Sequence, residues 1–362
     1  LHDDTFVTVD IGGGSTEFCF VKNGKIEKSI SLNIGTVRIK ELYFNKDDIK
    51  GAKEHILDNL KKIFELDIEI PKKVVGIGGS IRAFSKIVMA KNDYPLDILH
   101  GYTYNVKDEV SLFNKIINAR NNDDLKSIGV KKDRFDTIKE GAFIFKTILE
   151  ELEIDEVVTS GVGVREGAYL ADLLRTSNHK FPENFNVSVR SLLDRFQIDE
   201  KQSAYLGNNA KKIFEVLKPL HKLDDKYKAL LVISSKLNSI GSTLNFYKSN
   251  DNAFDFILNG LNYDFLHTSR ILVAHTIKFS KKSLPTKADI LKYEKLLPSL
   301  DVMKWMSFMI SLNIAVNQDF SRPKVSYELE GNVLKVILSN NSFLIESNID
   351  KLESPEDLII KL

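Results

Sequence analysis

The sequence predicts an α/β region, followed by an all-helical region and a short tail that contains strands. Within residues 5–176, β-rich runs alternate with helical patterns and glycine turns follow the strands, which is typical of α/β proteins. Residues 187–323 show one helical pattern after another, and the tail begins with two alternating runs joined by Glu-Gly-Asn. Because residues 175–186 are polar and contain proline, we expect the main boundary there. The expected domains are residues 1–176, 177–323 and 324–362.

The N-terminal elements define a meander of strands. Residues 5–9 and 17–21 are β-rich, the Asn-Gly pair within residues 22–25 indicates a tight turn, and a third strand follows that turn. Apolar residues at helical spacing then predict a helix over residues 46–65. Further along, the pattern predicts a strand and glycine loop before residue 80, helices over residues 108–150, a buried strand at 156–161 and a helix at 167–175.

The composition is that of an ordinary globular protein of 362 residues, with 43% hydrophobic and 28% charged residues. No apolar run approaches the roughly 20 residues that span a bilayer, so we expect no membrane association. The first residues lack the basic and apolar regions of a signal peptide, and the single Cys19 fits a reducing compartment. We therefore expect the protein to be cytoplasmic.

Charge is unevenly distributed along the chain. Residues 178–323 contain 21 Lys and Arg against 14 Asp and Glu, a net charge of +7, although the whole chain carries only +1. A basic middle region of this kind attracts anionic partners. The alternative is that these lysines only solvate helix faces.

The stretch "VDIGGGSTEF", residues 9–18, is the most informative motif. Three consecutive glycines, Gly12, Gly13 and Gly14, bring backbone amides close to a ligand without Cβ obstruction, and amides of this kind bind anions. The hydroxyls of Ser15 and Thr16 add donors. A strand follows the loop, whereas a Walker A loop or a Rossmann fingerprint would open a helix. The loop is therefore predicted to bind phosphate from within an antiparallel hairpin.

Two carboxylates flank this loop, Asp10 before it and Glu17 after it. A bare phosphate site would avoid them, because like charges repel. Their presence is explained if Mg²⁺ lies between carboxylate and phosphate oxygens, or if one of them orients an attacking water. The alternative is a tight turn with solvated acids.

A second glycine loop, "GIGGS", contains Gly78, Gly79 and Ser80 and precedes a helix. Glycine after a buried strand is common in α/β folds, so this loop alone is a weak signal. Together with the first loop it predicts two turns that face one phosphate site.

Four segments in this order, "DIGGGSTE", "LNIGTVRIKELYF", "GIGGSIRAFSKI" and "SGVGVREGAYL", resemble the Ppx/GppA family of exopolyphosphatases and guanosine pentaphosphate phosphohydrolases. The resemblance is specific over residues 5–175 and weaker through the helical region. It implies an actin-like fold, of the sugar kinase and Hsp70 type, followed by an HD-like helical domain. It also implies Mg²⁺-dependent removal of the terminal phosphate from inorganic polyphosphate or from the 5′ end of guanosine pentaphosphate, pppGpp.

The resemblance assigns roles to residues of this chain. Asp10 and Glu17 would be the metal-associated catalytic acids, and the first glycine loop, residues 12–16, together with the second, residues 78–80, would bind phosphate. Arg165 and Glu166 correspond to the late family signature. Arg38 would be a further residue of the site, or else a solvated arginine at a strand end.

The sequence also departs from the family pattern. The family's first phosphate loop and general-base glutamate lie upstream of the "DIGGGSTE" equivalent, and this sequence contains neither. We therefore expect the chain to be part of a longer enzyme, with hydrolysis impaired in the chain alone. In the helical region, Ser234, Ser235 and Lys236 stand near the place of the family's His-Asp pair, so the HD motif is degraded. Structural or surface roles are expected for the histidines, including His267 and His275.

The leading hypothesis is an exopolyphosphatase that also accepts pppGpp, with no nucleic-acid partner and with a homodimer left open. A second hypothesis is a regulator that binds polyphosphate or a nucleotide and has lost catalysis. A third is an actin-like kinase, although no acceptor-sugar site can be located in the sequence. Phosphate release separates the first from the second, and ATP-dependent transfer would identify the third.

Overall fold

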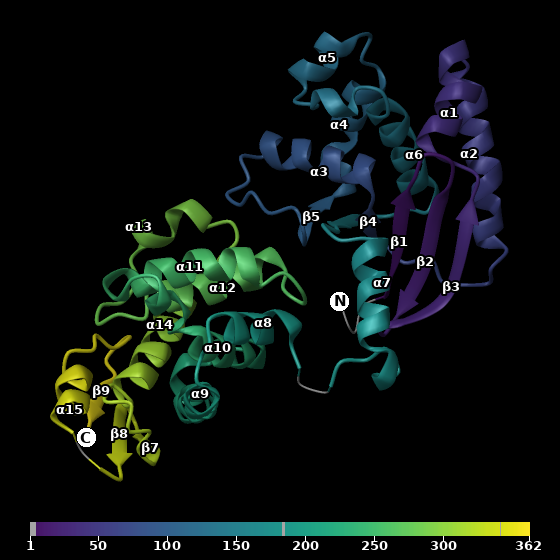
Figure 1. Cartoon of the computed structure of the whole chain (residues 1–362). Coiled ribbons are helices and arrows are strands. Elements are labelled where there is room, and N and C mark those ends of the chain that lie inside the picture. Colours follow the sequence, from purple (N-terminus) through teal and green to yellow (C-terminus); the bar gives the residue numbers. More distant parts are fainter. Residues whose placement is uncertain (1–4, 183–184, 341) are drawn as a thin grey trace. The chain divides into compact units, whose positions relative to one another are not determined.

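The computed structural model describes residues 5–182, 185–340 and 342–362, and the chain divides into two compact units, Leu1–Phe181 and Pro182–Leu362. Figure 1 colours the first unit purple to teal and the second teal to yellow. The structure groups residues 324–362 with the preceding helices in one unit. No described helix is long and apolar enough to cross a membrane.

The first unit is built on a six-stranded mixed sheet with strand order β3-β2-β1-β4-β6-β5. Its first three strands form the predicted antiparallel meander: β1 (Thr5–Ile11), β2 (Thr16–Lys22) and β3 (Lys25–Leu32). β4 (Lys73–Ile77) pairs parallel to β1, and β6 (Glu156–Thr159) pairs parallel to β4. β5 (Tyr102–Asn105) is the antiparallel edge. The predicted α/β class is confirmed for this unit.

Helices cover the sheet because alternate residues of the strands are apolar. Val7, Val9 and Phe18 are completely buried in one core with residues of α6 (Ile138–Glu151), which contacts α1, α2, α3 and α4. The other helices are listed here with their bounds: α1 (Thr36–Leu42), α2 (Ile49–Phe64), α3 (Gly79–Lys91), α4 (Val106–Ile117), α5 (Asn122–Ser127) and α7 (Val164–Leu173).

The last helix of this unit, α7, begins three residues before the predicted start at residue 167. The Glu166 carboxylate accepts a hydrogen bond of 2.8 Å from the Gly163 amide, and this cap allows the helix to begin at Val164. None of the residues of α7 is buried, and Val164 and Tyr169 are 77% and 67% exposed.

The second unit is mostly helical, as predicted. Its helices are α8 (Val187–Arg195), α9 (Glu200–His221), α10 (Asp225–Leu237), α11 (Ser249–Gly260), α12 (His267–Lys278), α13 (Lys287–Ile290) and α14 (Leu300–Ala315). The tail contains β7 (Val325–Glu330), β8 (Val333–Leu338), α15 (Phe343–Ile349) and β9 (Ile359–Lys361). β7 and β8 form the predicted hairpin, and β9 pairs parallel to β8.

A buried polar network lies in the core of this unit. The side chains of Asn209 and Asn313 bond at 2.8 Å, and Asn313 also donates to the Leu206 carbonyl at 2.8 Å and to Ser235 at 3.0 Å. The Tyr327 hydroxyl joins from β7 at 2.8 Å from Asn209. Ser235, one of the three residues near the expected position of the HD motif, is therefore part of a neutral hydrogen-bond network that connects α9, α10, α14 and β7.

Candidate active site

The loops that the sequence singled out lie at one edge of the first unit. β1, β4 and β6 are adjacent and parallel, and the glycine loop at residues 12–15, the loop at 78–80 and the loop at 160–163 follow their carboxyl ends. Ligands of open α/β sheets bind at this edge. The two glycine turns therefore face one site, as predicted.

The first glycine loop is held by the N-terminus of α1. The amides of Thr36 and Val37 donate to the carbonyls of Gly12 and Gly13 at 3.0 and 2.9 Å. Gly35 must be glycine here, because a Cβ would lie 2.4 Å from Gly13. Gly13 and Gly14 are exposed, and within the described residues no acceptor binds their amides. These two amides remain able to bind an anion.

Arg38 binds this loop from α1. Its Nε donates to the Gly14 carbonyl at 2.9 Å, across 24 residues of sequence. The alternative interpretation, a solvated arginine at a strand end, is wrong because Arg38 is helical and hydrogen-bonded. The loop thus has a guanidinium at its side.

The two carboxylates lie directly opposite each other. Asp10 on β1 is the register partner of Glu17 on β2, and Glu17 is in turn the partner of Ser31 on β3. Direct partners in an antiparallel pair point to the same face, with Cβ atoms about 4.5–5.5 Å apart. A row of Asp10, Glu17 and Ser31 therefore crosses the meander on the face opposite the buried residues Val9 and Phe18.

Hydroxyl groups orient Glu17. Its Oε1 accepts hydrogen bonds from Ser15 at 2.5 Å and from Ser31 at 2.9 Å. Ser15 therefore positions the carboxylate, and its proton is not directed at a ligand. Thr16 lies behind the loop: its side chain is buried and its hydroxyl donates to the Ile34 carbonyl.

Burial raises the pKa of Asp10, and the charge of Glu17 raises it further, whereas Arg82 lowers it. The cause is that two carboxylates share one partly buried face. A cation between them would relieve this repulsion. In the described part of the chain no group of three or more His, Cys, Asp or Glu residues could hold a metal ion. Two carboxylates plus substrate phosphates are nevertheless the ordinary ligand set of Mg²⁺, so the residues fit that ion.

The second glycine loop closes on Asp10. Gly78 has φ +91°, and a Cβ on it would lie 2.6 Å from Asp10 Oδ1, so both conformation and space require glycine. A Cβ on Gly79 would lie 2.5 Å from Arg134 Nη1. Ser80 is buried, and a Cβ on Gly141 of α6 would lie 2.5 Å from Ser80 Cβ, so Ser80 packs against that helix.

Two arginines of the site were not predicted. Arg82, on the first turn of α3, donates to the carbonyls of Ser160 and Val162, each at 2.8 Å, and so joins the second and third loops. It stands within the quoted segment "GIGGSIRAFSKI", where an arginine three residues after the glycines was the available signal. Arg134, from the short turn Lys132–Arg134, had no sequence signal because it is far from the glycines in the chain.

Glu166, one of the two residues of the late family signature, has a structural role in the start of α7. The Gly163 amide holds Glu166, and this hydrogen bond lowers the pKa of the carboxyl group. Arg165 is exposed, and no hydrogen bond or ion pair between it and the glycine loops is present among the described residues. The structure thus places Glu166 as a helix cap and Arg165 at the surface.

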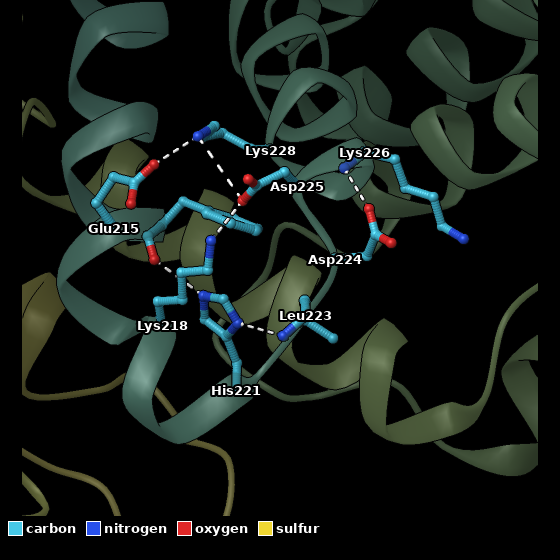
Figure 2. Close-up of polar contacts among 9 residues, drawn as sticks. Glu215, Lys218, His221, Leu223, Asp224, Asp225, Lys226 and Lys228 are labelled. Carbon is cyan, nitrogen blue, oxygen red and sulfur yellow. Dashed lines mark hydrogen bonds and ion pairs between the residues drawn. The ribbon is translucent and has the colours of Figure 1, made fainter.

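Two lysines of the basic middle region are paired with acids. In its densest segment, Lys218 bonds to Asp225 at 2.6 Å, and Lys228 bonds to Glu215 at 2.6 Å and lies 3.8 Å from Asp225 (Figure 2). Neighbouring acids on α9 and α10 therefore neutralise these lysines.

The carboxyl edge of the parallel strands thus brings together paired carboxylates, glycine amides that have no acceptor within the described residues, and arginines, at the edge where α/β sheets bind ligands. Consistent with this, residues 1–176 match the model of the Ppx/GppA phosphatase family. The first unit, which this match covers almost entirely, therefore belongs to the Ppx/GppA phosphatase family.

Individual relatives are similar over part of their length. A guanosine-5′-triphosphate,3′-diphosphate pyrophosphatase of Vibrio campbellii is 26% identical over 259 residues, which is 68% of this chain and 49% of that protein. A bifunctional 3-dehydroquinate synthase/phosphatase of Fusobacterium nucleatum is 32% identical over 168 residues, or 43% and 24%. A solved structure of the Aquifex aeolicus PPX-GPPA enzyme is 29% identical, with a TM-score of 0.40, covering 46% of this chain and 56% of that one. The chain spans about half the length of the curated relatives it matches.

Proposed function

We propose that this chain supplies the phosphate-binding edge of a phosphoanhydride hydrolase that releases the terminal phosphate of inorganic polyphosphate and of pppGpp. The proposal rests on Asp10 and Glu17, which are direct register partners on neighbouring strands. They lie beside the Gly13 and Gly14 amides, which have no acceptor within the described residues. Such a site binds a phosphoryl group and a divalent cation together. The curated relatives named as pyrophosphatases of guanosine-5′-triphosphate,3′-diphosphate support the nucleotide as a substrate.

In this mechanism the chain's own groups bind and orient the terminal phosphoryl group. The amides of Gly13 and Gly14 bind its oxygens, and Arg38 and Arg82 place positive charge at either loop. Ser15 and Ser31 hold Glu17 in one orientation toward the phosphate. Fixed donors of this kind stabilise charge that develops during in-line attack by water.

Asp10 and Glu17 would hold Mg²⁺, which when bound offsets the charge of the phosphate oxygens. Both carboxylates lie on one face. Burial is the main cause of the raised pKa of Asp10 and the charge of Glu17 raises it further, and a cation between the two carboxylates would remove this second contribution. Extensive chelation is therefore expected to abolish phosphate release.

We further propose that the first unit is half of an actin-like architecture and that the helical unit is HD-like. The mixed sheet with its three-stranded meander supports the first assignment. The helical content of the second unit supports the other.

The proposal is tested by orthophosphate release from long-chain polyphosphate and from pppGpp with Mg²⁺, comparing this chain with the full-length gene product. The chain alone should release little phosphate, and in the full-length protein Glu17→Gln should lower kcat/KM by about 10²- to 10⁴-fold, because the amide keeps the hydrogen bonds and loses the charge. Glu27→Gln is the matched control, since Glu27 is an exposed carboxylate of the same meander.

Equal activities of the two variants would contradict the role of Glu17. If the full-length protein binds either substrate but releases no phosphate, the alternative of a regulator that lost catalysis replaces the hydrolase.

A further inference from the structure

A large cavity opens beside the second glycine loop, within the first unit. Its volume is about 1560 Å³, and its lining begins with Gly79 and Arg82 of the candidate site and continues along α3 to α4, α5 and the turn at Arg134. Ligand pockets are commonly about 300–1,000 Å³, so this cavity has room for more than a terminal phosphoryl group.

The cavity is rich in cations without partners. Its lining contains seven Lys and Arg against four Asp. In the described part of the chain, no hydrogen bond or ion pair neutralises Lys86, Lys115, Lys126 or Lys131, although all four line the cavity and are exposed.

The remaining charged groups of the lining are partly engaged. Lys91 bonds to Glu109 at 2.9 Å, and Arg134 lies 3.4 Å from Asp133. One acid, Asp124, accepts a hydrogen bond from the Arg120 amide at 2.8 Å. Asp93 and Asp97 also line the cavity, so its seven Lys and Arg exceed its four Asp by three, and the lining keeps a net positive charge.

The cavity is continuous with the phosphate loops. Arg134 Nη1 stands 2.5 Å from where a Gly79 Cβ would be, so this guanidinium borders both the loop and the cavity. Lys86 follows Gly79 by seven residues on α3, about 10 Å at 1.5 Å per residue. A substrate held at the glycine loops can therefore extend along a row of cations.

The basic helices of the second unit make a contrast. Lys218 and Lys228 are neutralised by acids of the same two helices (Figure 2). Among the described residues these two lysines have acid partners, whereas Lys115 and Lys126 of the cavity have none.

We propose that this cavity binds the phosphate groups of the substrate that lie beyond the terminal one. The inference rests on the proposed function for the position of the terminal phosphate. The shared chemistry is an array of phosphates remote from the scissile bond, which belongs either to a linear inorganic polyphosphate or to the 3′-diphosphate of pppGpp.

The test is a double variant, Lys115→Gln with Lys126→Gln, in the full-length protein. Calorimetric binding of long-chain polyphosphate, pppGpp, GTP and tripolyphosphate is measured at two salt concentrations. We expect about tenfold weaker binding of long-chain polyphosphate or of pppGpp, with a shallower salt dependence, and a smaller loss for tripolyphosphate, which has fewer phosphates beyond the terminal one.

The matched control is Lys28→Gln with Lys53→Gln, which removes the same charge from exposed lysines of the same unit outside the cavity. It should change each affinity less than twofold. Equal effects of the two double variants, or none, overturn the proposal.

The binding measurements with different ligands distinguish the two possible substrates. A loss confined to long-chain polyphosphate assigns the cavity to the linear polymer, and a loss for pppGpp but not GTP assigns it to the 3′-diphosphate. If the full-length wild type releases no phosphate while the cavity variant still loses binding, the proposed hydrolase is wrong and the cavity site stands.

Discussion

The two units use polar groups in opposite ways. In the second unit, the side chains of Asn209, Asn313 and Ser235 satisfy one another, and the polar network is closed. At the edge of the first unit, the amides of Gly13 and Gly14 have no acceptor within the described residues. The first group is a buried structural network, whose polar atoms must be paired, whereas the second consists of exposed amides that a ligand can reach.

The lysines repeat this contrast. Those of α9 and α10 are the most conspicuous in the sequence, yet acids neutralise Lys218 and Lys228. Lys115 and Lys126 are scattered in the sequence but line one cavity. Density of charge along a chain is therefore a poor guide to where an anion binds, because the local acids decide what remains.

Blocking the glycine edge of the first unit should impair activity as well as stability. Gly78→Ala introduces a Cβ at φ +91° and 2.6 Å from Asp10 Oδ1, whereas Gly129→Ala meets the same φ problem, at +97°, with nothing within 4 Å. Each should lower the free energy of unfolding by about 1–2 kcal/mol. Only Gly78→Ala should also reduce phosphate release, by at least tenfold. Denaturation measures the stability of both variants, and enzyme kinetics measures their phosphate release. Equal activity in both variants would remove Asp10 from the site.

Disrupting the buried polar network of the second unit should lower the stability of the protein and leave its activity unchanged. Asn313→Ala removes the donor to Leu206 and Ser235 and the partner of Asn209, so we expect a loss of about 2 to 4 kcal/mol. Asn259→Ala, on an exposed face of α11, is the control and should change little. Urea denaturation measures both, and a loss of substrate affinity in folded Asn313→Ala protein would contradict the structural role.

The titration of His275 tests the apolar core of the second unit. Burial lowers its pKa from 6.5 to about 4, so between these pH values the unfolded chain binds a proton that the folded chain does not. Stability should therefore fall as pH drops from 6.5 toward 4, by about 2 to 3 kcal/mol from this group. His275→Phe should flatten this part of the stability curve, measured by denaturation at several pH values. An unchanged slope would show that the side chain is accessible to protons.

The smallest effect is expected for the paired lysines. Lys218→Gln with Lys228→Gln disrupts exposed ion pairs with Asp225 and Glu215, which contribute little in water. Binding of long-chain polyphosphate should change less than twofold, in contrast to the cavity variant. A tenfold loss in calorimetry would reverse the comparison and return the polyanion to the helical unit.

Much of the site was predictable from the sequence because its signals are local. The glycine triplet, its flanking carboxylates and the alternation of the strands are read within ten residues, and a hairpin brings Asp10 opposite Glu17. Less predictable were the roles of the hydroxyls. Thr16 became a buried support and Ser15 an orienting group, because the pleat alternates side chains between the core and the ligand face.

By itself, the sequence determined the three-stranded meander, the division into an α/β and a helical region, the two glycine loops and the acids beside them, since these follow from backbone freedom and hydrophobic period. The short elements α1, β5, α15 and β9 were not predicted. Only the tertiary structure decided which cations serve the site. Arg82 reaches a carbonyl 78 residues away, and Arg134 meets Gly79 from a separate turn. Lys115 and Lys126 come to one cavity in the same way. These contacts depend on how distant segments pack, and no local pattern in the chain encodes them.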